Sequence, residues 1–188
     1  MKFLRKIINT LLSLILGNAL ILFFKFNGPP NLLLFSSRLN KKILELFGAT
    51  IGKNVFILSP LICAGVKANN GYQNLIIGDN CRFGGNIFLD LTERIVLESG
   101  VSLGANVTII THNRYNNNTF LEDRLFYTCG KKEVILKKGA NIKSGALLSH
   151  GIIIGENAVV SGNSFVNFDV PDNCVVSGVP AKIVIKLD

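Results

Sequence analysis

The sequence repeats every six residues from Ile51 onward, and this period restricts the possible folds more than any other feature. In each hexad the first residue is a large aliphatic or aromatic one, the fourth is mostly Asn or Gly, and the fifth is small or aliphatic. The hexads begin at Ile51, Ile57, Ile77, Phe83, Leu89, Leu97, Leu103, Ile109, Leu136, Ile142, Leu148, Ile154, Val160 and Val166.

Each column of the repeat has a physical cause. The fifth residue of one hexad and the first of the next are two apart, so on an extended strand both side chains point to the same side. Asn and Gly tolerate the positive φ that a sharp turn requires. Three strands and three turns close a triangular prism after about 18 residues, and stacked coils satisfy the backbone. The repeat therefore predicts a parallel β-helix.

Several short motifs carry a resemblance to a known family. IGKN, IGDN, LGAN and IGEN resemble the hexapeptide repeats of left-handed β-helix acyltransferases. The opening run FGATIGKN and the closing run GVPAKIV resemble those of bacterial exopolysaccharide O-acetyltransferases and of maltose and galactoside acetyltransferases. The resemblance covers residues 46–184 and implies that the β-helix is left-handed. We therefore expect an all-β, left-handed parallel β-helix with N-terminal amphipathic helices and one long excursion loop.

The repeat is interrupted at three places. It slips by two residues between Ile57 and Ile77 and again between Leu89 and Leu97, and neither slip carries evident chemistry. The long break follows the Ile109 hexad, where residues 113–133 are too irregular for the prism and are predicted to leave one corner as a loop. Long excursions from a regular fold are commonly functional.

His112 stands directly ahead of this loop, at the fourth position of its hexad. A side chain in this turn column points away from the sealed interior, so its imidazole is exposed and able to exchange protons near neutral pH. A solvent-facing histidine without a function is the alternative. The sequence has one other histidine, His150, at the third position of a hexad and without a loop beside it.

The resemblance assigns roles around His112. In the resembled enzymes a histidine at this place is the general base that removes a proton from a sugar hydroxyl, which then attacks acetyl-CoA without an acyl-enzyme. His112 is thus the expected catalytic residue, and Asn86 and Asp90, about one coil earlier, are expected to bind the acceptor sugar. A carboxylate or a carbonyl group must orient the imidazole. Asp90 and Glu93 are both candidates for that role.

The resemblance also implies acetyl-CoA as co-substrate and no metal ion. The pantetheine arm is expected to pass backbone groups of the C-terminal coils, one of which would face the developing oxyanion. Two lysines near the end of the chain are expected beside the CoA phosphates. The expected cofactor-binding residues are Ser144, Gly145, Ser161, Gly162, Lys182 and Lys186.

The N-terminal 50 residues differ in composition from the rest. They carry seven cations and one anion, which is +6 of the net charge of +8. The body from residue 51 onward is close to neutral, so a nucleic-acid-binding surface is not expected. Residues 7–24 form an apolar run behind a basic start. This run fits an interfacial helix or a short membrane span, and a signal peptide is the rival, although no A-x-A-like cleavage site follows.

A second amphipathic stretch runs from Leu32 to Phe47, with cations on its polar face. It is expected either to cap one end of the prism or to contact anionic lipid headgroups, and both roles are compatible. We therefore divide the chain into membrane-associating helices over residues 1–50, with membrane contact through 1–47, and a β-helix domain over 51–188. The four cysteines are far apart and are expected to be reduced thiols in a cytosolic protein.

The leading functional prediction is an acetyl-CoA-dependent O-acetyltransferase. Its acceptor would be a sugar hydroxyl of a cell-surface polysaccharide or of a lipid-linked precursor, and it would act as a homotrimer on the inner face of the cytoplasmic membrane. One alternative is N-acylation of an amino sugar nucleotide. Another is a non-catalytic, membrane-tethered β-helical scaffold. The acceptor sugar and the acyl group are left open by the sequence.

Overall fold

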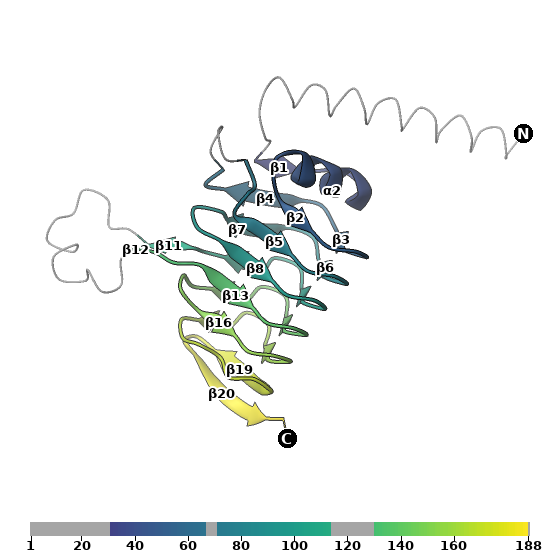
Figure 1. Ribbon diagram of the computed structural model, residues 1–188. Helices are drawn as coiled ribbons and strands as arrows, with labels where there is room; N and C mark the ends of the chain where they lie inside the picture. Colours follow the sequence, from purple (N-terminus) through teal and green to yellow (C-terminus); the bar gives the residue numbers. More distant parts are fainter. Residues whose placement is uncertain (1–30, 67–70, 114–129, 188) are drawn as a thin grey trace, which may run out of the picture.

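The protein is a tall stack of short strands that form three faces of a prism, closed at one end by a helix and at the other by a hairpin (Figure 1). The computed structural model describes residues 31–66, 71–113 and 130–187. The predicted interfacial segment 7–24 and most of the predicted loop 113–133, including Cys129, lie outside the described residues.

Each face of the prism is one sheet of short strands. Face 1 contains β2 (Thr50–Ile51), β5 (Leu75–Ile77), β8 (Ile95–Leu97), β13 (Val134–Leu136) and β16 (Ile153–Ile154). Face 2 contains β3 (Phe56–Ile57), β6 (Arg82–Phe83), β9 (Ser102–Leu103), β14 (Asn141–Ile142), β17 (Val159–Val160), β19 (Cys174–Gly178) and β20 (Ala181–Lys186). Face 3 contains β1 (Leu32–Leu33), β4 (Leu61–Ala64), β7 (Ile87–Asp90), β10 (Thr108–Ile109), β15 (Leu147–Leu148) and β18 (Phe165–Val166).

The chain visits the faces in the order 1, 2, 3, and the turns between them make three corners. We call the turn from face 1 to face 2 corner 1, the turn from face 2 to face 3 corner 2, and the turn from face 3 to face 1 corner 3. Strands in neighbouring coils are parallel, except where β1 and β20 pair antiparallel with their neighbours at the two ends of the stack. A separate antiparallel ribbon, β11 (His112–Asn113) with β12 (Gly130–Lys131), leaves corner 3.

The interior is filled as the repeat predicts. The first residues of the hexads are buried, apart from half-buried Ile51, and the fifth residues are buried except for half-buried Glu93 and Asn113 at the irregular turns. The narrow column thus alternates large side chains such as Leu148 with small ones such as Ala146, and both are fully enclosed. Cys63, Cys81 and Cys174 are buried in this core as free thiols, as expected.

The turn column is confirmed by the backbone. Asn54, Asn80, Asn86, Asn106, Asn157 and Asn163 have positive φ, as do Gly100, Gly139, Gly145 and Gly151. Asparagines of neighbouring coils are also hydrogen-bonded to each other. For example, the amide nitrogen of Asn86 donates to Asn106 Oδ1 at 2.6 Å. The expected turn at His112 is wrong, since His112 has no positive φ and is the first residue of strand β11.

The stretch from Leu32 to Phe47 caps the prism, which confirms one of its two predicted roles. Its first residues form strand β1, and helix α2 (Ser37–Leu46) then lies over the open end of the column with Ile43 and Leu44 fully buried. Buried Asn40 satisfies its amide by donating to Phe35 O and Ser59 Oγ, both at 3.0 Å. Within the described residues, no helix is both long and apolar enough to cross a membrane.

Candidate active site

Corner 3 departs from the regular turn in the coils that surround His112. After β7 the chain makes an enlarged turn through Leu91 and Glu93, and after β10 it continues through Thr111 into the β11–β12 ribbon. The backbone N–H of Glu93 donates to Thr111 Oγ1 at 3.0 Å, which ties the two coils together. Two irregular turns therefore stack on one another and enclose a polar cluster.

Asp90 is the centre of this cluster and is 2% exposed. Its Oδ1 accepts hydrogen bonds from the backbone N–H and the hydroxyl of Thr92, at 3.1 and 2.6 Å. Its Oδ2 accepts bonds from the backbone N–H groups of Thr111 and His112, at 2.9 and 3.2 Å. The Thr111 hydroxyl donates to the Asp90 carbonyl oxygen at 2.7 Å. A buried carboxylate with this many donors is fixed in position and well satisfied.

The same donors determine the charge of Asp90. Burial raises the pKa of the Asp90 carboxyl, but the hydrogen bonds donated by Thr92, Thr111 and His112 outweigh that effect, so its pKa lies below the ordinary value. Asp90 is therefore a carboxylate at neutral pH and can only accept hydrogen bonds.

His112 completes the cluster. Its Nδ1 lies 2.5 Å from Asp90 Oδ2. Because the carboxylate can only accept, Nδ1 must carry the proton, and the neutral ring then has its lone pair on Nε2. The imidazole is 45% exposed, whereas the Asp90 side chain is 3% exposed. Within the described residues Nε2 makes no hydrogen bond, so the basic nitrogen is available to a ligand at the surface.

This geometry selects between the two predicted orienting groups. Asp90, and not Glu93, bonds to the imidazole, so the structure brings the predicted pair Asp90 and His112 together. The slip between Leu89 and Leu97, which carries no evident chemistry in the sequence, lies in the turn that follows Asp90 and presents it to His112. Sequence reasoning missed Thr92 and Thr111. The available signal was the coincidence of a slip and a loop at the same corner.

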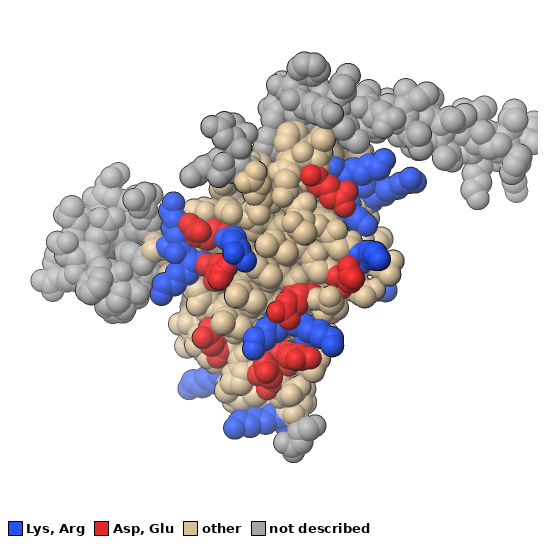
Figure 2. Space-filling view, in the orientation of Figure 1, with Lys and Arg blue, Asp and Glu red and all other residues tan. Residues whose placement is uncertain are grey.

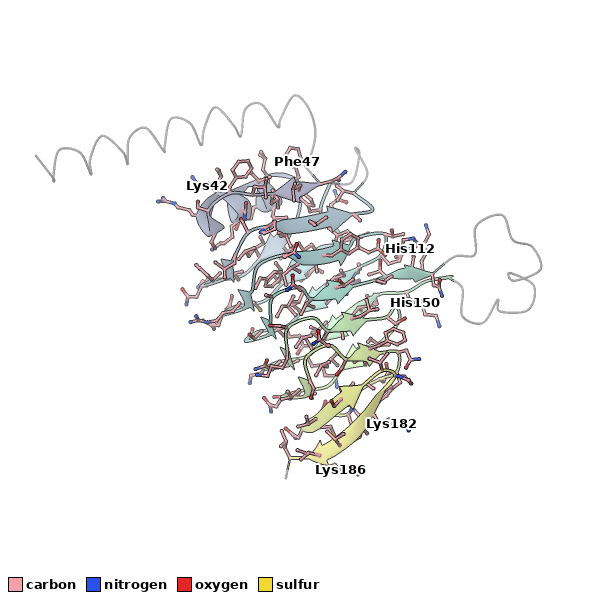
Figure 3. All side chains as sticks on the ribbon, turned by 180° about the vertical axis from the view of Figure 1, so that it is seen from behind. Lys42, Phe47, His112, His150, Lys182 and Lys186 are labelled. Carbon is pink, nitrogen blue, oxygen red and sulfur yellow. The ribbon has the colours of Figure 1, made fainter. Side chains whose placement is uncertain are left out.

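The other predicted site residues lie elsewhere on the prism. Asn86 is at corner 2, bonded to Asn106, and is not beside His112 within one chain. The four predicted backbone positions for CoA also lie at corner 2: Ser144, Gly145, Ser161 and Gly162. Lys182 and Lys186 are exposed on β20, at the C-terminal end of the molecule (Figure 3). Within one chain, the expected base at corner 3 and the expected cofactor surface at corner 2 are therefore apart.

The corner 2 backbone suits a slender ligand at two of the four positions. The N–H groups of Gly145 and Ser161 donate to the carbonyls of Ala105 and Val176, so neither is available to a ligand. Ser144 and Gly162 are exposed, and in the described chain their N–H groups make no backbone hydrogen bond. A pantetheine arm that binds this corner would meet these two donors.

A polar groove of about 550 Å³ lies at corner 3 in the coils below the ribbon. Asn113 and Lys132 line it from the ribbon, and His150, Asn167 and Asp169 line it from the coils. Asn113 and Lys132 alternate along their strands with His112 and Lys131, so they project from the opposite face of the ribbon. Figure 3 shows His150 below His112 at the same edge. The second histidine thus belongs to a different surface from the first.

Comparison with solved structures settles the handedness that the repeat leaves open. An acetyl-CoA complex of a hexapeptide-repeat acetyltransferase from Vibrio cholerae is 23% identical, with a TM-score of 0.69, over 92% of this chain and 85% of that one. A galactoside acetyltransferase in complex with coenzyme A is 20% identical, with a TM-score of 0.68, over 93% and 80%. The fold is a left-handed parallel β-helix.

A third similar structure is a maltose O-acetyltransferase from Clostridium difficile, which is 23% identical with a TM-score of 0.68 over 92% of this chain and 84% of that chain. No protein-family model and no curated protein sequence matches this chain. The left-handed β-helix fold predicted from the hexapeptide motifs is confirmed by these structures.

Proposed function

We propose that this left-handed β-helix is an acetyl-CoA-dependent O-acetyltransferase that modifies a sugar hydroxyl. The observation that carries the proposal is the Asp90–His112 pair, in which a buried carboxylate holds an exposed imidazole with Nε2 directed outward. The similar structures include acetyltransferases with acetyl-CoA or coenzyme A bound and enzymes named for galactosides and maltose. A non-catalytic scaffold has no need of such a pair.

The chemistry follows from the state of the ring. Acetyl-CoA supplies the acetyl group as a thioester, which needs no metal ion to be activated. His112 accepts the proton of the acceptor hydroxyl at Nε2 while that oxygen attacks the acetyl carbonyl. His112 then returns the proton to the departing thiolate as the carbon–sulfur bond breaks. Asp90 stabilises the imidazolium that exists between these transfers and keeps the ring in the tautomer that the reaction requires.

We propose that the working unit is a homotrimer. The outward side chains of face 1 form an apolar ladder of Ile76, Val96, Ile135 and Ile153, which are paired in register from coil to coil. Figure 2 shows a broad uncharged area over this face. Apolar ladders of this kind favour contact with another protein surface. In a closed trimer, corner 3 of one subunit can face corner 2 of the next, which would bring His112 to the Ser144 and Gly162 backbone.

We propose further that the trimer associates with the inner face of the cytoplasmic membrane. The basic and apolar N-terminal sequence supports this, as do exposed Arg38 and Lys42 on the outer side of helix α2. Exposed Leu32 and Leu34 lie on the chain just before this helix. Membrane attachment would place the enzyme near lipid-linked saccharides, which are precursors of cell-surface polysaccharides. We therefore favour such an acceptor.

The test measures thiol release from acetyl-CoA with a panel of saccharide acceptors, using the full chain. We expect His112→Ala to lower turnover by at least about 10²-fold, with the melting temperature and the oligomeric state unchanged. His150→Ala is the matched control and should retain activity within about twofold, because His150 lies on the other side of the ribbon. Near-normal turnover of His112→Ala would overturn the proposal.

The same assay separates O-acetylation from N-acylation of an amino sugar nucleotide. A soluble nucleotide sugar needs no membrane, so deletion of residues 1–30 should leave N-acylation unchanged. Deletion should impair acetyl transfer to a lipid-linked acceptor presented in vesicles. Mass spectrometry of the product identifies the acetylated atom, as an ester that alkali removes or an amide that it does not.

A further inference from the structure

The ribbon places a lysine directly opposite the proposed base. In the antiparallel pairing of β11 with β12, His112 is the register partner of Lys131. The neighbouring pair is hydrogen-bonded, because Lys132 N donates to Thr111 O at 2.9 Å. Bonded and non-bonded pairs alternate along an antiparallel ladder, so His112 and Lys131 form a non-bonded pair. The side chains of such a pair project from the same face, with Cβ atoms about 4.5–5.5 Å apart.

Two of the described acidic residues of this region, Glu133 and Asp90, are engaged with other groups. Glu133, two residues beyond Lys131, pairs with Arg94 at 3.4 Å. Asp90 is enclosed by its donors and by His112. Glu93 is half-buried in the turn above, and Lys131, which is exposed, forms no ion pair within the described ranges. Figure 2 shows Lys and Arg side chains interleaved with Asp and Glu side chains where the ribbon leaves the prism. Among the described residues, Lys131 is therefore a positive charge on the same face as His112 that no carboxylate pairs with.

Lys132, the adjacent lysine, serves a different surface. It projects from the opposite face of the ribbon, where it lines the polar groove with His150. Its aliphatic stem lies over Gly151, because a Cβ added to Gly151 would meet Lys132 Cδ at 2.7 Å. The two lysines are thus not one basic patch, and only Lys131 shares the face of the imidazole.

We propose that Lys131 recognises an anionic group of the acceptor, so that the preferred substrate is an acidic saccharide with a carboxylate or a phosphate close to the acetylated hydroxyl. This inference rests on the proposed function and names its substrate class. The acceptor must place its hydroxyl at His112 Nε2, and a neighbouring anion of the same sugar is then within reach of a lysine ammonium group. The CoA phosphates are a poor match for Lys131, because the whole pantetheine arm separates them from the thioester that reacts at His112.

The experiment compares matched acceptors with the full-length protein and acetyl-CoA. A methyl glucoside is the neutral acceptor, a methyl glucuronide adds a carboxylate, and a glucose phosphate adds a phosphate. We expect wild type to have a kcat/KM about 10-fold or more higher for at least one charged acceptor, and this preference should shrink as salt rises. The two charged acceptors distinguish a carboxylate from a phosphate as the recognised group.

The variants then assign the preference to one residue. Lys131→Met should raise KM about 10-fold for the preferred charged acceptor and leave the neutral acceptor within about twofold. Lys131→Arg should retain most of the preference, because it keeps the charge. Lys138→Met, at an exposed position of corner 1, is the control and should change neither. Saturation-transfer NMR without acetyl-CoA should show the same loss of glucuronide or sugar-phosphate binding in Lys131→Met.

The outcomes separate this inference from the proposed function. Turnover without any preference for charged acceptors, or an equal loss of kcat on all acceptors in Lys131→Met, would overturn the role of Lys131 in acceptor selection. Equal loss would instead indicate that the lysine stabilises the developing oxyanion or the ribbon. Absence of turnover on every acceptor would overturn the proposed function itself, and the inference with it.

Discussion

Corners 1 and 2 of the prism differ from corner 3, although all three belong to the same coils. At corners 1 and 2, Asn or Gly with positive φ recurs from coil to coil, and the turns stack in register. At corner 3, the turn is enlarged around Gly71, enlarged again after Asp90 and replaced by the ribbon after Thr111. Among the described coils, the two nearest the C-terminus turn there without an insertion, at Gly151 and at Phe168.

This difference shows how one repeat supports both a scaffold and the candidate site. Regular corners satisfy most of their own backbone through inter-coil hydrogen bonds such as Gly139 N to Ser99 O, although at corner 2 the N–H groups of Ser144 and Gly162 make no backbone hydrogen bond in the described chain. The irregular corner has backbone donors that no coil neighbour accepts, and Asp90 accepts them instead. The carboxylate that the irregular backbone requires is the same one that orients His112. Asp90 therefore both satisfies the backbone of the irregular turn and orients the imidazole.

Replacing the Asp90 carboxylate should have a larger effect than any glycine or threonine change at these corners. We expect Asp90→Asn to lower turnover by about 10²-fold or more, because a neutral amide of the same size cannot stabilise the imidazolium of His112. Steady-state kinetics with a stability measurement on the same sample provides the check. Glu93→Gln, in the same turn, is the control and should lose much less. Equal losses would mean that the corner as a whole, and not Asp90, supports the base.

Gly71 at corner 3 and Gly100 at corner 1 should also respond differently to an added methyl group. Gly71 and Gly100 both have positive φ, so Ala at either position costs about 1 kcal/mol of left-handed strain. At Gly100 an added Cβ stays 3.8 Å from the nearest backbone atom, whereas at Gly71 it would overlap the Phe47 carbonyl oxygen. We therefore expect Gly71→Ala to lower the free energy of unfolding by about 2 kcal/mol more than Gly100→Ala. Urea denaturation measures both, and similar values would refute the close packing at corner 3.

The hydroxyl of Thr111 gives a smaller test of the polar cluster. Thr111→Val keeps the shape of the side chain but removes the bonds to the Asp90 carbonyl and from Glu93 N. The expected cost is about 1–2 kcal/mol in unfolding free energy, since a buried backbone carbonyl and a partly buried backbone N–H lose their partner. Thr108→Val, on the outer face of β10, should stay within about 0.5 kcal/mol. A neutral Thr111→Val would show that water replaces the hydroxyl.

Lowering the pH should reduce the stability of corner 3 less than any of these substitutions. Because the folded-state pKa of Asp90 is lowered, its contribution to stability is fully present above the ordinary value of 3.8 and is lost as pH falls through the lowered value. The stability difference between wild type and Asp90→Asn should therefore shrink as pH falls below about 3.8 and stay constant above it. Denaturant midpoints measured across that range test the sign. A gap that widens in acid would contradict the lowered pKa.

Much of the fold was determined by the sequence alone, because its cause is local. Whether a residue turns with positive φ, or shares a face with the residue two positions away, depends on the residue and its neighbours. The hexad columns therefore predicted the buried column and the turns, with His112 as the exception. The loop marked the corner at which His112 lies.

Only the tertiary structure decided which groups surround His112. Asp90 is 22 positions earlier, and a slip of two residues moves the register by which coils stack, so its contact with His112 could not be read from spacing. Lys131 is the cross-strand partner of His112 because the chain returns antiparallel in a ribbon, and a six-residue period gives no sign of pairing across an excursion. Periodicity fixes which face a residue occupies, whereas the stacking of irregular turns fixes which residues meet.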